Sequence, residues 1–222
     1  MSYKRQINPL KIKSGLELTA DLIGIGFMLS GKSAPNPNIE DSLLSAAKEG
    51  MAGDFRTLSL LVNWLEIHLP YVNADRMNRI LQQENEERLK AFWIAIAQRF
   101  KTDRRFASLA RKMRGRQIDL IESKSSYLLQ TKGCDPRFEK TCLRVPAGLL
   151  RHRPKDILSP NELAKHHIGY RYRIIMGPSY RADMWAQIEL QPNLSTAELA
   201  RVCYGSFATA WKVIQDKKLV AA

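Results

Sequence analysis

Apolar residues recur at three- and four-residue steps through most of the first 115 residues of the chain. One stripe of this kind comprises Leu89, Phe92, Trp93, Ile96, Ala97 and Phe100. A second comprises Phe55, Leu58, Leu61, Val62, Leu65 and Leu69. Such spacing places the apolar side chains on one face of a helix with 3.6 residues per turn. We therefore expect a helical bundle domain over residues 1–115.

Capping residues predict where some of these helices begin and end. Asp54 stands just before the second stripe as an N-cap, and Pro70 follows it as a stop signal. Asn38 or Asp41 is expected to cap another helix, and Ser14 to begin the first one.

The pattern changes near Gly115. Residues 117–121, 126–130 and 142–145 look like short strands, and a Lys-Gly-Cys-Asp-Pro turn separates the last two. We expect a small β-containing connector over residues 116–150.

Two capping boxes mark helix starts in the last third of the chain, residues 151–222. Residues 159–162 and 195–198 both carry the Ser-x-x-Glu pattern, in which the serine accepts from an amide while the glutamate reaches back. The boxes belong to a longer similarity between residues 158–169 and 194–205. This is either a tandem repeat or the shared capping pattern of two ordinary helices, and the second interpretation is favoured because the following residues diverge.

Small and apolar residues stand at fixed positions near the end of the chain. Residues 198–200 read Glu-Leu-Ala, residues 205–206 read Gly-Ser, and residues 209–213 read Thr-Ala-Trp-Lys-Val. This pattern resembles the helix-turn-helix of winged-helix DNA-binding domains. The three expected helices span residues 180–190, 196–203 and 206–217.

The resemblance implies that the third helix enters the major groove of DNA. Its groove-facing positions are then Ser206, Phe207, Ala208, Thr209, Trp211, Lys212 and Gln215. Hydroxyl, amide and ammonium groups among them suit base edges or phosphates. The two aromatic side chains either contact thymine methyl groups or pack on the N-terminal domain.

Two features depart from the family pattern. The turn glycine normally comes one residue earlier than Gly205, where this chain has Tyr204. A tyrosine adopts a positive φ less readily than glycine, so we expect either a distorted turn or a left-handed Gly205. Residues 217–220 begin the wing, which is stunted because the sequence ends at Ala222.

The chain is strongly basic, with 35 Lys and Arg against 22 Asp and Glu and a net charge of +13. This excess favours polyanionic partners. One basic run comprises Arg99, Lys101, Arg104, Arg105, Arg111, Lys112, Arg114 and Arg116. A second comprises Arg144, Arg151, Arg153, Lys155, Lys165, Arg171 and Arg173. Either run is a solvated face or a surface that binds phosphates, and we favour the second interpretation. We therefore expect basic residues of these runs to clamp the DNA backbone beside the third helix, namely Arg104, Arg105, Arg111, Lys112, Arg114, Arg116, Arg171 and Arg173.

The remaining composition points to a cytoplasmic protein, associated with the nucleoid if bacterial. The longest apolar-rich run, residues 16–29, is too short to span a bilayer, and no signal-peptide core follows the basic N-terminus. The three cysteines indicate reduced thiols and no disulfide framework.

Other chemistry is weaker. Residues 26–33 match G-x-x-x-x-G-K-S, the phosphate-binding loop, but Pro35 and Pro37 follow where a helix is required, so a helix end plus a loop is favoured. The adjacent His166 and His167 lack metal-ligand spacing. We therefore expect no metal, no cofactor and no enzyme.

We accordingly predict a mainly α protein with a helical bundle, a β-containing connector and a helical region (151–222) that ends in a helix-turn-helix (177–222). The predicted function is sequence-specific or semi-specific binding of double-stranded DNA by a homodimeric transcriptional regulator. The alternative is a protein-interaction module whose helix-turn-helix is buried against the bundle. RNA binding and nucleotide binding through residues 26–33 are further alternatives.

Overall fold

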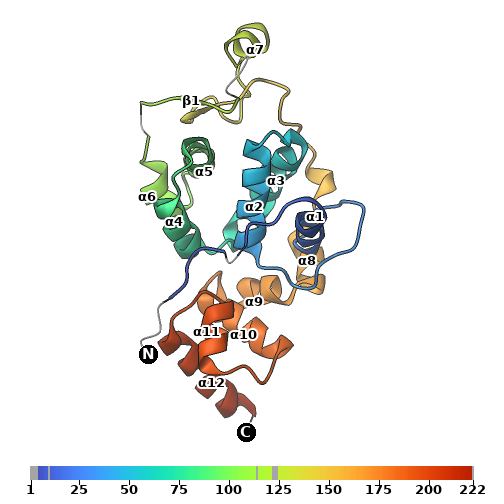
Figure 1. The fold of residues 1–222 in the computed structure, drawn as a ribbon, viewed down its shortest axis with the longest axis vertical. Coiled ribbons are helices and arrows are strands. Elements are labelled where there is room, and N and C mark those ends of the chain that lie inside the picture. Colours follow the sequence, from blue (N-terminus) through green and yellow to red (C-terminus); the bar gives the residue numbers. More distant parts are fainter. Residues whose placement is uncertain (1–4, 10, 114, 122–124, 222) are drawn as a thin grey trace.

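The computed structural model describes residues 5–9, 11–113, 115–121 and 125–221, and the protein is mainly helical (Figure 1). The first six helices are α1 (Gly15–Gly24), α2 (Ile39–Met51), α3 (Phe55–His68), α4 (Ala74–Gln83), α5 (Glu87–Arg99) and α6 (Ala107–Ala110). The other six are α7 (Ser125–Lys132), α8 (Pro160–His166), α9 (Ile168–Met176), α10 (Tyr180–Leu190), α11 (Thr196–Val202) and α12 (Phe207–Ala221). Short 3-10 turns lie at Leu69–Tyr71, Arg104–Phe106 and Pro154–Asp156. Within the described residues, no helix is long and apolar enough to cross a membrane.

The capping predictions for α2 and α3 are confirmed. Asp54 accepts from the amides of Arg56 and Thr57, and Asn38 accepts from the amide of Asp41. Ser14 occupies the N-cap position of α1, but its side chain makes no capping hydrogen bond. Both Ser-x-x-Glu boxes also form, at the starts of α8 and α11.

The connector contains less β structure than predicted. Two strands, β1 (Ile118–Asp119) and β2 (Leu143–Arg144), pair in parallel, with Ile118 opposite Leu143. The strand predicted at 126–130 is wrong, because this segment lies in α7. Five residues are too few to distinguish the 3.6-residue repeat of a helix from the two-residue repeat of a strand. In addition, Gly133, with φ +73°, supplies the left-handed residue that commonly ends a helix.

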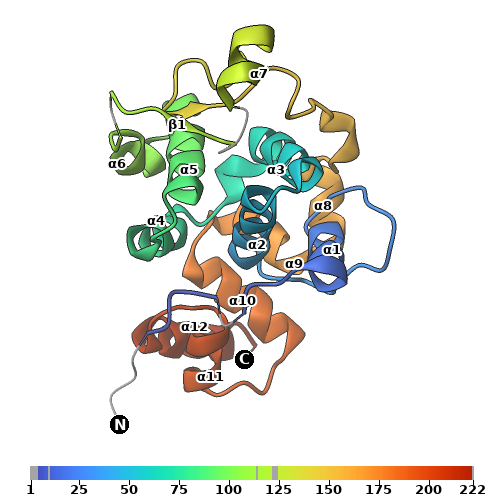
Figure 2. The same ribbon diagram turned by 45° about the horizontal axis from the view of Figure 1, so that its top comes forward.

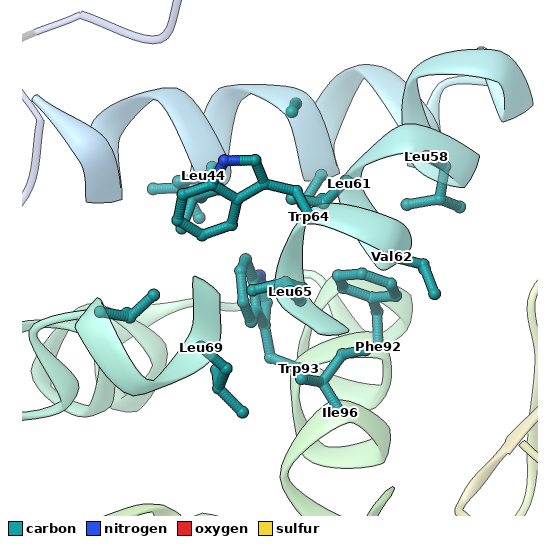
Figure 3. Close-up of a cluster of buried hydrophobic side chains, with 14 of the residues drawn as sticks. Leu44, Leu58, Leu61, Val62, Trp64, Leu65, Leu69, Phe92, Trp93 and Ile96 are labelled. Atoms are coloured by element: carbon teal, nitrogen blue, oxygen red, sulfur yellow. The ribbon is translucent and has the colours of Figure 1, made fainter. Parts of the chain in front are cut away.

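Most of the chain shares one hydrophobic core, built from buried side chains between Leu18 and Tyr170. Figure 3 shows Phe92, Trp93 and Ile96 of α5 meeting Val62 and Leu65 of α3. This core includes connector residues such as Phe138 and Leu143, and α8 residues such as Leu163. The buried side chains therefore do not divide at residues 115 or 150.

A second, smaller core holds α10, α11 and α12 together at the end of the molecule opposite α7 (Figures 1 and 2). Its buried members are Met184, Ile188, Leu199, Ala200, Cys203, Ala210 and Val213. We call α10–α12 the C-terminal unit. The stunted wing predicted at residues 217–220 is wrong, because α12 continues to Ala221. Nothing in the Lys-Lys-Leu-Val sequence breaks a helix.

Two buried histidines join α9 to the bundle in their neutral forms. His167 Nδ1 accepts from the Tyr170 amide at 3.0 Å, so the proton on Nε2 points at the Pro37 carbonyl, 2.9 Å away. His68 Nδ1 lies 2.6 Å from the Tyr170 hydroxyl, and its Nε2 lies 2.9 Å from the Leu158 carbonyl. Burial lowers the pKa of each histidine from 6.5 to about 4.

We predict that the free energy of unfolding falls as the pH is lowered from 6.5 to about 4. Between these pH values the histidines bind protons in the unfolded chain but not in the folded protein, so protonation favours unfolding. Below about pH 4 the contribution of the two histidines to the free energy of unfolding no longer changes. Each histidine contributes at most roughly 3 kcal/mol. His167→Asn, which keeps a capping acceptor, should flatten the pH dependence measured by urea denaturation. The exposed neighbour is the control, and an equal effect of His166→Asn would contradict the prediction.

Candidate nucleic-acid interface

The outer face of α12 is open to solvent. Phe207 is 44% exposed and Trp211 is 54% exposed, and Ala208 and Lys212 are exposed beside them. The opposite face of the helix, with Ala210 and Val213, is buried in the core of the C-terminal unit. Neither aromatic side chain is buried, as the alternative in which the helix-turn-helix is buried against the bundle would require.

The remaining predicted positions on α12 are less exposed. Ser206 accepts from the Thr209 amide at 3.0 Å, and the two hydroxyl groups lie 2.7 Å apart. Ser206 thus caps α12 as predicted. Gln215 is half-buried one turn beyond Trp211. The face open to a ligand is formed mainly by the aromatic residues and Lys212.

The turn between α11 and α12 is left-handed at Tyr204, with φ +56°, and not at Gly205. Three contacts compensate for this backbone conformation. The Tyr204 hydroxyl donates to Asp41 Oδ2 at 2.6 Å, the Arg76 guanidinium lies 3.5 Å from the ring centroid, and Arg5 Nε donates to the Tyr204 carbonyl at 2.9 Å. The departure from the family pattern therefore attaches the turn to α2 and α4.

Gly205 does not adopt a positive φ, and its lack of a side chain instead allows close packing. A Cβ atom at this position would overlap the Cε atom of Met184, so the end of this buried, flexible side chain would have to move. The glycine thus lets the start of α12 approach α10.

A buried ion network lies beneath this turn. Arg173 of α9 donates to Glu40 of α2 at 2.7 and 2.8 Å, and to Asp183 of α10 at 2.7 and 3.0 Å. Burial opposes ionisation of Glu40, but the charges of Arg173 and Arg76 hold its pKa below the usual range. The network links the C-terminal unit to the bundle through charged groups.

Arg173 was predicted to contact DNA, and this prediction is wrong. Its side chain is 2% exposed, and Glu40 and Asp183 bind it from two elements. Arg171, two residues earlier, is exposed on the other face of α9 and pairs with Glu189 at 2.8 Å.

The basic residues of the run at 99–116 differ in their exposure and in their partners. Arg105 is anchored, since it pairs with Asp103 and donates to the carbonyls of Leu69 and Val72. Arg116 pairs with Glu87 on the surface. Among the described residues of this run, those that are exposed and make no ion pair are Lys101, Arg104, Arg111 and Lys112; Arg114 lies outside the described residues.

One part of this run lies beside the C-terminal unit, and the other part lies away from it. Arg105 lines a pocket together with Ser179 and Tyr180 at the start of α10. Helix α6, which precedes Arg111, lies apart from α12 in both ribbon views (Figures 1 and 2). The run is therefore not one continuous clamp beside α12.

The C-terminal unit itself carries little net charge. Residues 177–222 contain five basic and four acidic residues, and so only +1 of the total of +13. Its exposed cations include Arg201 and Lys218, which the sequence reasoning did not single out. Both residues lie off the apolar stripe of their helix, and this position in the sequence pattern predicts an exposed side chain.

Residues 26–33 do not form a phosphate-binding loop. The segment follows helix α1 and precedes turns and bends, and the next helix begins only at Ile39. The helix end plus loop favoured from the sequence is confirmed. Among the described residues, no group of three His, Cys, Asp or Glu side chains is arranged to hold a metal ion.

Comparisons of the chain with known family models, with curated proteins and with solved structures found no match.

We predict that Arg173→Met destabilises the protein by about 3–5 kcal/mol, because it leaves buried carboxylates without their main partner. Arg171→Met is the matched control and should cost no more than about 1 kcal/mol, since it breaks only a surface pair. Urea denaturation followed by circular dichroism measures both. Equal losses in the two variants would show that the buried network has no special role.

Proposed function

We propose that the protein binds double-stranded DNA and regulates transcription, with the C-terminal unit acting as a helix-turn-helix. The observation that carries this proposal is the exposed outer face of α12 from Phe207 to Lys212. A helix that is packed on one side and open on the other is what insertion into a major groove requires.

The contacts that hold the unit support the same function. Tyr204, Arg173 and Asp183 attach α9–α11 to the bundle, while Phe207 and Trp211 on the outer face of α12 are exposed. Rigid presentation of a helix lowers the entropic cost of binding. In this proposal, Lys212 and Gln215 contact bases or phosphates, and Phe207 and Trp211 contact thymine methyl groups.

Phosphate contacts are expected from cations around the unit. Arg201, Lys212 and Lys218 are exposed on its helices, and Arg104 is exposed on the segment that adjoins the start of α10. Arg111, Lys112 and Arg116 belong to a separate surface and are not required for insertion of α12. Arg173 has no part in DNA contact.

A protein partner is the second candidate, favoured by the chemistry of the open face. Phe207 and Trp211 on this face are 44% and 54% exposed, Val202 at the end of α11 is 46% exposed, and the unit is nearly neutral overall. Aromatic residues are enriched at the centres of protein interfaces. Salt dependence distinguishes the two candidates, because phosphate contacts release counterions and an apolar interface does not.

We predict that the full chain binds a fluorescent 20-base-pair duplex with an affinity that falls steeply as salt rises. Lys212→Ala combined with Gln215→Ala should weaken binding to selected sequences roughly ten-fold, and binding to random DNA less. Anisotropy titrations measure both. Lys132→Ala, an exposed charge on α7, is the control. Salt-independent binding, or an equal effect of the control, would refute the proposal.

Tryptophan emission gives a second readout in the same titration. Of the four tryptophans, Trp211 is 54% exposed, Trp64 and Trp93 are buried, and Trp185 is half-buried against the core of the C-terminal unit. Duplex DNA should quench the emission of the wild type, and Trp211→Phe should remove most of that change.

We further predict a homodimer on paired half-sites, because one helix-turn-helix reads only a few base pairs. Light scattering of the protein with and without a selected duplex measures the mass. A strict monomer that binds with a one-to-one ratio in both states would contradict this prediction.

A further inference from the structure

A pocket of about 530 Å³ opens between the start of α3 and the segment that follows β2. Its lining is partly apolar and partly charged. Met28, Phe55 and Leu149 contribute apolar surface, whereas Arg56, Arg151 and Arg153 contribute three cations against the one carboxylate of Asp156. Its size lies within the range of small-molecule sites.

Buried polar side chains hold the segment that carries two of these arginines. The Arg151 amide donates to Ser59 Oγ at 3.0 Å, and the Arg151 carbonyl accepts from Asn63 Nδ2 at 3.1 Å. The Arg153 amide donates to Asn63 Oδ1 at 3.1 Å. Asn63 is fully buried. The backbone of this segment is therefore fixed against α3, while the guanidinium groups remain on the surface.

The positive charge in the pocket is not balanced. Within the described residues, Arg56 and Arg151 have no ion-pair partner, and Arg153 has only Asp156, at 3.8 Å. All three arginines are exposed, and all three line this one pocket. Guanidinium groups match a phosphate, since each donates paired hydrogen bonds to its oxygens.

The apolar part of the pocket is accessible as well. Met28 is 60% exposed, and Phe55 and Leu149 are half-buried. The Met28 backbone is fixed, because its amide donates to the Asp156 carbonyl at 2.8 Å. An apolar surface bordered by arginines suits a ligand with an apolar body and an anionic end.

We propose that this pocket binds a phosphate ester, with its phosphate on Arg56, Arg151 and Arg153 and its apolar body against Met28 and Leu149. Nucleoside monophosphates and alkyl phosphates share this chemistry. None of the lining residues belongs to the C-terminal unit, so the site is separate from the face of α12 and does not depend on the proposed DNA binding.

Isothermal titration of the full chain tests the site with four probes: AMP, hexyl phosphate, adenosine and inorganic phosphate. One ester should bind at least ten-fold more tightly than adenosine and inorganic phosphate, and its identity reveals the nature of the apolar body. Arg151→Gln should weaken that binding about ten-fold. Arg111→Gln, which removes an exposed charge elsewhere, should leave it unchanged.

Met28→Asp tests the apolar part, and should abolish binding while leaving thermal melting unchanged, since this side chain is largely exposed. The proposal is overturned if neither ester binds with a dissociation constant below about 1 mM. It is also overturned if inorganic phosphate binds as tightly as the esters, or if Arg111→Gln and Arg151→Gln have equal effects.

Discussion

The arrangement of the protein depends on one buried arginine. Arg173 of α9 binds Glu40 of α2 and Asp183 of α10, and so it links the bundle to the C-terminal unit. Buried charges are costly unless they are paired with good geometry. The cost restricts how the two cores fit together, because displacement of the unit would leave charged groups without partners. A purely apolar contact would tolerate more sliding.

Tyr204 extends this constraint to the turn that precedes α12. Its left-handed backbone conformation is unusual for a tyrosine, and its side chain reaches Asp41 and packs under Arg76 of the same polar region. Strained residues of this kind persist when their surroundings over-determine them. The outer face of α12 is consequently presented in a defined direction, with its aromatic side chains partly exposed to solvent.

The cationic surplus of the chain is divided among surfaces with different roles. Arg173 is buried and Arg105 is anchored to backbone carbonyls at the surface, whereas Arg116 and Arg171 form surface ion pairs. Arg56 and Arg151 line the pocket beside α3 and have no ion-pair partner within the described residues. The net charge alone therefore does not identify the class of partner. Which arginines meet solvent, and beside which apolar groups, carries the chemical information.

The sequence by itself determined the mainly α class, the stripes of α3 and α5, the caps at Asn38 and Asp54, and both capping boxes, because these depend on contacts within a few residues. Only the tertiary structure decided that Arg173 is buried, that Tyr204 and not Gly205 is left-handed, that residues 126–130 are helical and that Phe207 and Trp211 are exposed. These outcomes depend on partners far away along the chain, such as Glu40 and Asp41, which local periodicity does not encode.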